Sequence, residues 1–402
     1  MAANTAIEDR VVQLGPGLSA IPERLLLAHA RGEVLFICGA GVSQPAGLPG
    51  FRQLVLDVYA TLDTSTHSVL MELPARACNQ WLTNCAGLTD RQTAEVRRFI
   101  QGDYDVVLGM LERRLDDQTR GDSQVRRTVA TILRSGAASP APIHRALIAL
   151  ADRGGAKTIV TTNFDLLLQV AAQRLRSPVE TYSLGSIPRP SRSSEFSGVL
   201  HIHGALDKSP ARTSELVLSD QDFGEFYLRR RVVPDFIYDA ARLYHLVLVG
   251  YSANDPPMRY LLNAVAADGN RFDDLKERFA FFGTTSPDAV ALADWNGRGI
   301  TPVHYDSTNG HTALRATLEQ WAALSAINGK KEKIDAELRR TVKLSRSAAK
   351  ESDRDLFDHF FRRSNASERV RLSALVSDAK AEIGWLDAVV KVCAEAERGR
   401  KL

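Results

Sequence analysis

Short, largely apolar runs that each end in glycine or polar residues constrain the fold of this chain more than any other feature. The runs are 34–38 (VLFIC), 158–162 (TIVTT), 199–202 (VLHI), 246–249 (LVLV) and 279–282 (FAFF). A strand that is apolar on every side must be covered on both faces, as in a parallel sheet. Helix-like stretches separate the runs, at 164–174, 219–242 and 256–266. This alternation predicts an α/β fold with a doubly wound, Rossmann-like parallel sheet.

Two regions stand outside this alternation. Residues 54–135 read as a helical insertion, and residues 328–402, with 18 basic and 13 acidic residues, as a C-terminal helical extension. Three amphipathic helices are expected in the extension, with these apolar stripes: Ile334, Leu338 and Val342; Leu356, Phe357, Phe360 and Phe361; Ile383, Leu386, Val390 and Cys393. Exposed positive faces on such helices favour an assembly or partner module over a catalytic one. The expected division is an N-terminal segment (1–30), an α/β domain (31–327) and the extension (328–402).

Composition excludes several classes of function. The chain has 51 Lys+Arg and 48 Asp+Glu, a net charge of +3, which is too small an excess for a protein that coats nucleic acid. No apolar stretch is long enough to span a membrane, and the start, MAANTAIEDR, lacks the pattern of a signal peptide. The four cysteines form no C-x-x-C pair, so no four-thiolate zinc site is expected. We expect a cytoplasmic protein with no membrane contact and no direct nucleic-acid binding.

Glycines follow the first apolar run directly, in 39–43 (GAGVS), and 47–52 (GLPGFR) comes soon after. Glycines at the end of a buried strand allow a pyrophosphate to approach the backbone amides closely. Behind Pro49 and Phe51, Arg52 could close over a phosphate as a bidentate donor. The structural alternative is an ordinary tight turn between a strand and a helix.

Polar clusters also follow three later runs, and open α/β sheets bind ligands at the carboxyl ends of their strands. In 161–165 (TTNFD), Thr162, Asn163 and Asp165 could contact ribose hydroxyls, or one of them could cap the next helix. In 201–204 (HIHG), the period-two geometry of a strand predicts both histidines on one face, with His203 suited to act as a general base or to remain a core histidine. The stretch 250–256 (GYSANDP) fits phosphate binding, a helix start, or both.

In this order, G-A-G-x-S with G-x-P-x-F-R, T-x-N-x-D, H-G and G-x-S, the motifs resemble the sirtuin family over roughly residues 30–325. The resemblance implies that 31–327 is an NAD-binding catalytic domain. It assigns Asn163 and Asp165 to the nicotinamide ribose and the catalytic water, and His203 to the role of general base. It places the following residues at NAD: Gly39, Ala40, Gly41, Ser43, Phe51, Arg52, Thr162, Gly250 and Ser252.

One departure from the family refines this expectation. Protein-deacylating sirtuins carry a zinc ribbon of two C-x-x-C pairs after the histidine, whereas no cysteine lies between His203 and Gly250. The chain therefore resembles the branch without zinc that occurs in bacterial antiphage defence and hydrolyses NAD to ADP-ribose and nicotinamide. The resemblance implies an NAD glycohydrolase (NADase), with NAD as its substrate and no zinc or other metal, that acts in abortive infection by depleting NAD.

The expected partners follow from the need to control such an activity. Residues 328–402, with a contribution from 54–135, are expected to mediate assembly with copies of the same chain, as a homo-oligomer, or with a partner encoded in the same operon. The resemblance to sirtuin-like defence proteins of this size implies a HerA-type ATPase as that partner. Two alternatives also involve NAD. One is a protein deacylase or ADP-ribosyltransferase, and the other is a sensor that binds NAD or ADP-ribose without turnover. A further alternative is a nucleic-acid-binding protein that acts through residues 328–402.

Overall fold

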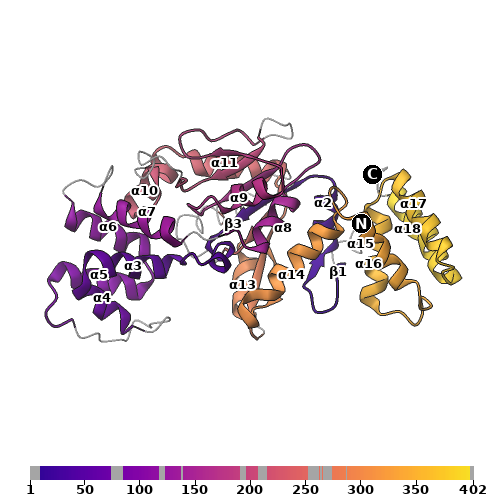
Figure 1. Ribbon diagram of the computed structural model, residues 1–402, viewed down its shortest axis with the longest axis horizontal. Helices are drawn as coiled ribbons and strands as arrows, with labels where there is room; N and C mark the ends of the chain where they lie inside the picture. Colours follow the sequence, from indigo (N-terminus) through magenta and orange to yellow (C-terminus); the bar gives the residue numbers. More distant parts are fainter. Residues whose placement is uncertain are drawn as a thin grey trace.

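The computed structural model describes residues 10–73, 85–116, 123–136, 139–190, 196–206, 215–251, 262, 265, 274–286 and 288–398. A central sheet with helices on both faces forms the middle of the molecule, as Figure 1 shows. Helices α3–α7 lie at one end, and helices α15–α18 lie at the other. The predicted α/β class is confirmed.

Seven parallel strands form the central sheet, in the order β5–β6–β4–β3–β7–β8–β9. Their bounds are β3 Val34–Cys38, β4 Thr158–Thr161, β5 Glu180–Tyr182, β6 Gly198–His201, β7 His245–Val249, β8 Arg278–Thr284 and β9 Ile300–Asp306. The first of these, β3, is flanked by β4 on one side and by β7 on the other. The order of the strands reverses at this point, which is where open α/β sheets bind their ligands.

All five predicted runs are strands, and the described residues contain four further strands that the sequence analysis missed. Two of them, β5 and β9, are the edges of the sheet, where burial is partial and the apolar signal is weak. The other two, β1 (Val11–Gln13) and β2 (Ala20–Pro22), form a separate antiparallel pair. The predicted helix at 256–266 falls largely outside the described residues.

Two hydrophobic cores lie on opposite faces of the sheet. Val34, Phe36 and Cys38 of β3 belong to one core, and the alternate residues Leu35 and Ile37 belong to the other. The first core is covered by helices α2 (Glu23–Ala30), α8 (Pro142–Leu150), α9 (Leu167–Arg174) and α14 (Thr308–Leu324). The second is covered by α10 (Asp220–Phe223), the π-helical segment η4 (Gly224–Arg229), α11 (Val232–Leu243) and α13 (Ala289–Gly297).

Between β3 and β4 the described chain is helical. After the short 3₁₀ turns η1 (Ala40–Val42) and η2 (Gln44–Ala46) come α3 (Phe51–Leu62), α4 (Thr64–Met71), α5 (Asp90–Gln101), α6 (Tyr104–Leu115) and α7 (Gln124–Gly136). A buried ion-pair network joins these helices to the second core. Arg126 of α7, 1% exposed, donates to Glu112 of α6 at 2.9 Å and to Asp222 of α10 at 2.6 Å.

In its described part, residues 328–398, the C-terminal extension has four helices where three were predicted: α15 (Lys331–Thr341), α16 (Glu351–Arg363), α17 (Ala366–Asp378) and α18 (Ile383–Arg398). The first two predicted apolar stripes are buried, but the third prediction, that Ile383, Leu386 and Val390 form the packed face of the last helix, is wrong. Trp385 of α18 is fully buried and lies 4.6 Å from the ring of Phe357, whereas Ile383 and Val390 are each 70% exposed. The bulk of the tryptophan side chain decides which face of α18 packs.

This extension is attached to the sheet domain by a buried ion pair. Glu23, at the start of α2, accepts hydrogen bonds from Arg362 at 2.6 and 2.7 Å and lies 3.2 Å from the ring nitrogen of His359. Glu23 and His359 are each 1% exposed. Together these contacts lower the pKa of the Glu23 carboxyl against the opposing effect of burial. The helices of the extension therefore share a core with the sheet domain.

Candidate active site

Three strand ends meet at the switch point and pack against each other through their backbones. The amide of Gly39 donates to the carbonyl of Val249 at 2.9 Å, and the amide of Thr162 donates to the carbonyl of Cys38 at 3.0 Å. A Cβ on Gly39 would lie 2.6 Å from the carbonyl oxygen of Gly250, which itself has a φ of +61°. The close approach of the β3 and β7 loops therefore requires glycine at both positions.

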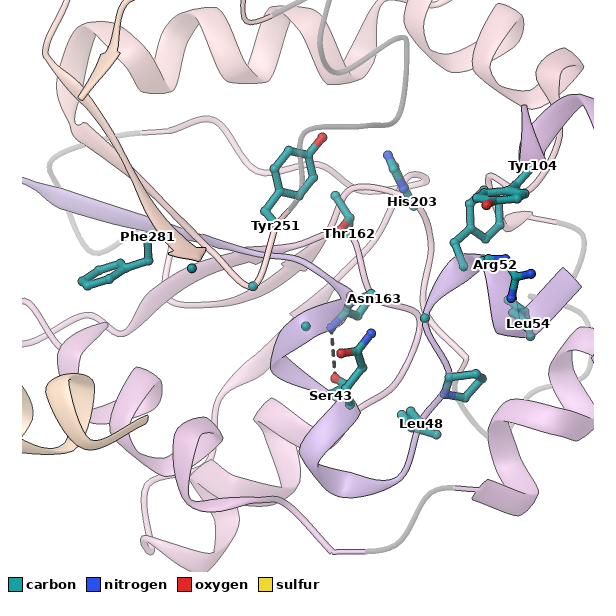
Figure 2. A pocket seen from close by; sticks show the side chains of 18 of the residues that line it. Ser43, Leu48, Arg52, Leu54, Tyr104, Thr162, Asn163, His203, Tyr251 and Phe281 are labelled. Carbon is teal, nitrogen blue, oxygen red and sulfur yellow. Dashed lines mark hydrogen bonds between the residues drawn. The ribbon is translucent and has the colours of Figure 1, made fainter. Parts of the chain in front are cut away.

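Asn163, Ser43 and Asp165 form a chain of hydrogen bonds across two of these loops. Figure 2 shows the bond between Asn163 and Ser43. The Nδ2 of Asn163 donates to the Gly39 carbonyl at 3.1 Å and to the Oγ of Ser43 at 3.0 Å. Ser43 donates in turn to the Oδ2 of Asp165 at 2.8 Å. The other oxygen of Asp165 accepts from the amide of Leu167, the first residue of α9, at 3.0 Å. The N-cap position of α9 is Leu166, so neither Asn163 nor Asp165 is the helix cap that the structural alternative predicted.

The two histidines of 201–204 serve different cores, so the prediction that they share a face is wrong. The Nδ1 of His201 donates to the backbone carbonyl of Asn163 at 2.7 Å, and its Nε2 lies 2.7 Å from Gln169 of α9. His203 lies against Phe223 on the opposite side of the sheet, with ring centroids 5.4 Å apart. Strand β6 ends at His201, so the period-two rule no longer applies two residues later.

The environment of His203 is almost dry. Its side chain is 7% exposed, its Nε2 lies 2.7 Å from the hydroxyl of Tyr227, and Phe223 packs edge-on against its ring. Burial lowers the pKa of His203 to about 3. The imidazole is therefore neutral at physiological pH, which is the form that can accept a proton.

A cavity of about 730 Å³ opens at the carboxyl ends of the central strands. This volume is in the usual range for small-molecule sites. The expected residues that line it are Ala40, Gly41, Ser43, Phe51, Arg52, Thr162, Asn163, Asp165, His203 and Gly250. Gly39 does not line it and instead holds Asn163 through its carbonyl. Ser252 lies outside the described residues.

Arg52 lies at the wall of the cavity with its guanidinium engaged elsewhere. It donates to the carbonyl of Leu73 at 3.2 Å and stacks over the ring of Phe99 at 5.2 Å. In Figure 2, Arg52 lies beside Tyr104 and Leu54, on the side away from Phe281. A role as a phosphate clamp would require this side chain to change its partners.

The far half of the cavity was not expected from the sequence. Apart from Tyr251, which belongs to the 250–256 stretch, it is lined by Tyr305 of β9 and by residues that follow β8 and β9, among them Asp288, Asp294, Trp295, Arg298 and His311. The hydroxyl of Tyr305 lies 3.0 Å from the Nδ1 of His311, which has a left-handed backbone. The segments after β8 and β9 carry no glycine-rich motif, and β9 itself was missed. Only the order of the strands brings them to the cavity.

The described part of the chain contains no group of three or more histidine, cysteine or acidic side chains placed to hold a metal ion. Within the same residues, no helix combines the length and the apolar character needed to cross a membrane.

A cavity lined by backbone and polar side chains at the switch point of a doubly wound sheet is the arrangement of nucleotide-binding α/β proteins. The comparison with protein families narrows the class for one segment. Residues 157–303 match the family model described as "SIR2-like domain". This sirtuin-like segment contains Asn163, His203 and Gly250.

Two further proteins are similar to parts of this chain. The "Uncharacterized protein y4cA" of Sinorhizobium fredii (strain NBRC 101917 / NGR234) is 35% identical over 310 residues, a match that covers 75% of this chain and 23% of that protein. The chain thus spans less than a quarter of the length of this relative. A solved structure described as "Structural Basis for the Mechanism and Regulation of Sir2 Enzymes" is 17% identical, with a TM-score of 0.36, over 75% of this chain and 97% of the other.

Proposed function

We propose that the protein is an NAD glycohydrolase that cleaves NAD with water to ADP-ribose, nicotinamide and a proton. One observation carries the proposal: the side chains of Asn163 and His203, which come from different strand ends, line one cavity at the switch point of a sirtuin-like sheet. The cavity is large enough for a small-molecule ligand, and the loop after β3 supplies backbone groups along its wall.

Asn163 is proposed to orient the attacking water or the ribose hydroxyls. Both hydrogens of its side-chain amide are used, toward the Gly39 carbonyl and toward Ser43. This leaves Oδ1 as the atom that accepts a hydrogen bond from a ligand. Asp165 acts on the loop itself, because its carboxylate accepts from Ser43 and from the amide of Leu167.

His203 is proposed to accept the proton that the water or a ribose hydroxyl gives up. Burial keeps the imidazole neutral and therefore able to accept a proton, but it also weakens the ring as a base, because it disfavours the imidazolium. Phe223 packs edge-on against the ring and shields it from bulk water. Loss of a positioned acid–base group typically slows a reaction by about 10²–10⁴-fold.

The decisive experiment is incubation of the purified full chain with NAD and identification of the products by mass spectrometry. We expect nicotinamide and ADP-ribose from the parent and a loss of about a hundredfold or more in Asn163→Ala and in His203→Ala. His67→Ala, on α4 and outside the cavity, is the matched control and should keep the parental rate. A parental rate in Asn163→Ala or His203→Ala would refute the assignment.

The same assay separates the alternatives. Release of nicotinamide that requires an added peptide or protein would identify a deacylase or ADP-ribosyltransferase instead. A rise in melting temperature with NAD and no product would identify a sensor. Steeply salt-dependent binding of DNA to the full chain, lost when basic residues of α15–α18 are replaced, would support the nucleic-acid alternative.

The biological setting is also part of the proposal. Because the sequence resembles the zinc-free sirtuin branch of antiphage defence, we propose that the protein acts in the cytoplasm as an antiphage effector that depletes NAD. We further propose that it works as a homo-oligomer or with a HerA-type ATPase or another operon-encoded partner. The assay with NAD is therefore to be repeated with the operon partner present, and the molar mass of the chain measured in both cases.

A further inference from the structure

His203 and Tyr227 form a buried pair whose role the proposed function leaves open. The Nε2 of His203 lies 2.7 Å from the hydroxyl oxygen of Tyr227, which is a full hydrogen bond. The two residues are 7% and 4% exposed. His203 lines the cavity, whereas Tyr227 does not. The tyrosine therefore has no direct contact with a ligand in this cavity, whereas its hydrogen bond to the histidine connects it to one.

The partner of one ring nitrogen decides what the other nitrogen can do. A neutral imidazole carries one proton, so one nitrogen donates and the other accepts. If the proton is on Nε2, that nitrogen donates to Tyr227 and Nδ1 keeps its lone pair. If Nε2 instead accepts from Tyr227, Nδ1 carries the proton and can accept none. Because Nε2 is directed at Tyr227, Nδ1 is the ring nitrogen left for a cavity ligand.

We propose that Tyr227 is a positioning residue that holds His203 in the tautomer with its proton on Nε2, so that Nδ1 is the basic atom. The inference rests on the proposed function of His203. In the step concerned, the O–H bond of the water or ribose hydroxyl breaks, and its proton forms a bond to Nδ1. The imidazolium that results donates from Nε2 to the Tyr227 oxygen, which stabilises the positive charge in the dry pocket.

The position of Tyr227 is restricted by the segment that carries it and by the residues packed around it. Tyr227 belongs to the π-helical segment η4, and such segments occur frequently at functional sites. The helix before it, α10, is anchored by Asp222, which accepts from Arg126 at 2.6 Å and from the Ser219 hydroxyl at 2.9 Å. Phe223 packs against both rings of the pair, with centroid separations of 5.4 Å. These contacts restrict the position of Tyr227, as a residue that sets the tautomer of His203 requires.

The kinetic test is Tyr227→Phe, which removes the hydroxyl and keeps the ring. We expect kcat for NAD cleavage to fall about tenfold or more, as when an imidazole loses the partner that sets its tautomer. KM should stay unchanged, because Tyr227 does not line the cavity. The matched control is Tyr59→Phe, which removes another buried hydroxyl with a 2.8 Å hydrogen bond, to Glu95, outside the cavity. It should lower stability comparably and leave kcat unchanged.

A second measurement does not depend on turnover. Long-range ¹H–¹⁵N NMR spectra of the full chain with labelled histidine report which ring nitrogen carries the proton, and His203→Gln identifies the signal. We expect the proton on Nε2 in the parent and a mixture of tautomers in Tyr227→Phe. A proton on Nδ1 in the parent, or a parental kcat in Tyr227→Phe, would overturn the inference. If the parent cleaves no NAD, the proposed function fails, and the spectra still decide whether Tyr227 sets the tautomer.

Discussion

The amide of Asn163 and the hydroxyl of Ser43 lie 3.0 Å apart although the two residues are 120 positions apart in the chain. Ser43 follows β3, and Asn163 follows the neighbouring strand β4. The parallel pairing of the two strands brings both loops to the same edge of the sheet. The bond therefore orients the side chain that is proposed to act on the ligand.

Replacement of Ser43 by alanine tests this relationship. Ser43→Ala removes one acceptor of the Asn163 amide and the donor to Asp165, so the amide is held only by its bond to the Gly39 carbonyl. We expect kcat for NAD cleavage to fall by about 10-fold or more and the free energy of unfolding to fall by about 1–3 kcal/mol. Kinetics and urea denaturation of the same variant check both. Ser43→Thr, which keeps a hydroxyl, serves as the comparison, and an unchanged kcat in Ser43→Ala would contradict the orienting role.

Replacement of Gly39 by any residue with a Cβ is expected to destabilise the protein, because the backbone of the β7 loop lies too close. In Gly39→Ala the new Cβ would meet the carbonyl oxygen of Gly250 at 2.6 Å and Cα of Tyr251 at 2.9 Å, and both atoms belong to the backbone. We expect a loss of about 1–3 kcal/mol in the free energy of unfolding, together with a loss of NAD binding. Gly297→Ala is the matched control, because its Cβ would meet no atom within 4 Å. Equal melting temperatures for the two variants would show that the loops do not constrain each other.

The ion pair of Glu23 is expected to hold the C-terminal helices on the sheet domain. Glu23→Ala leaves Arg362 without its buried carboxylate, which should cost about 3–5 kcal/mol. Glu277→Ala breaks the pair with Arg24, in which the glutamate is 44% exposed, and should cost about 1 kcal/mol or less. Chemical denaturation of the two variants provides the comparison. The same reasoning predicts that a chain cut near residue 326 exposes its core, so point variants test the assembly role better than truncation.

Acidification is expected to destabilise the protein through its buried neutral histidines. Burial lowers the pKa of His29 to about 4 and that of His203 to about 3, from the ordinary value of 6.5. Between those values and 6.5 the unfolded chain binds more protons than the folded one. The free energy of unfolding is therefore fully present above pH 6.5 and falls below it, by about 1.4 kcal/mol per pH unit for each histidine.

Urea denaturation at about pH 7.5 and about pH 5.5 measures this slope. His29→Gln carries no group that titrates in this range, so its stability should fall less steeply with acid than that of the parent. His29 packs against Trp321 and bonds to the Leu150 carbonyl, outside the cavity, so the variant leaves the proposed catalytic groups intact. A stability that does not change between the two conditions would contradict the prediction.

Local patterns predicted the centre of the sheet well and its edges poorly. Residues 34–38 are apolar because β3 is covered on both faces, and that requirement is visible in the sequence. β9 is buried at only some of its positions and contains polar residues, so it carries no comparable signal. The far half of the cavity was missed for the same reason, since it depends on where β8 and β9 end.

The sequence by itself determined the strands of the sheet centre and the polar residues at their ends, because burial and turn chemistry act over a few neighbouring residues. Only the tertiary structure decided that His203 pairs with Tyr227, that Glu23 holds Arg362 and that Trp385 selects the packed face of α18. Each of these depends on the distance and orientation between segments that fold separately. A hydrogen bond or a ring contact exists only when those are satisfied, and no local pattern encodes them.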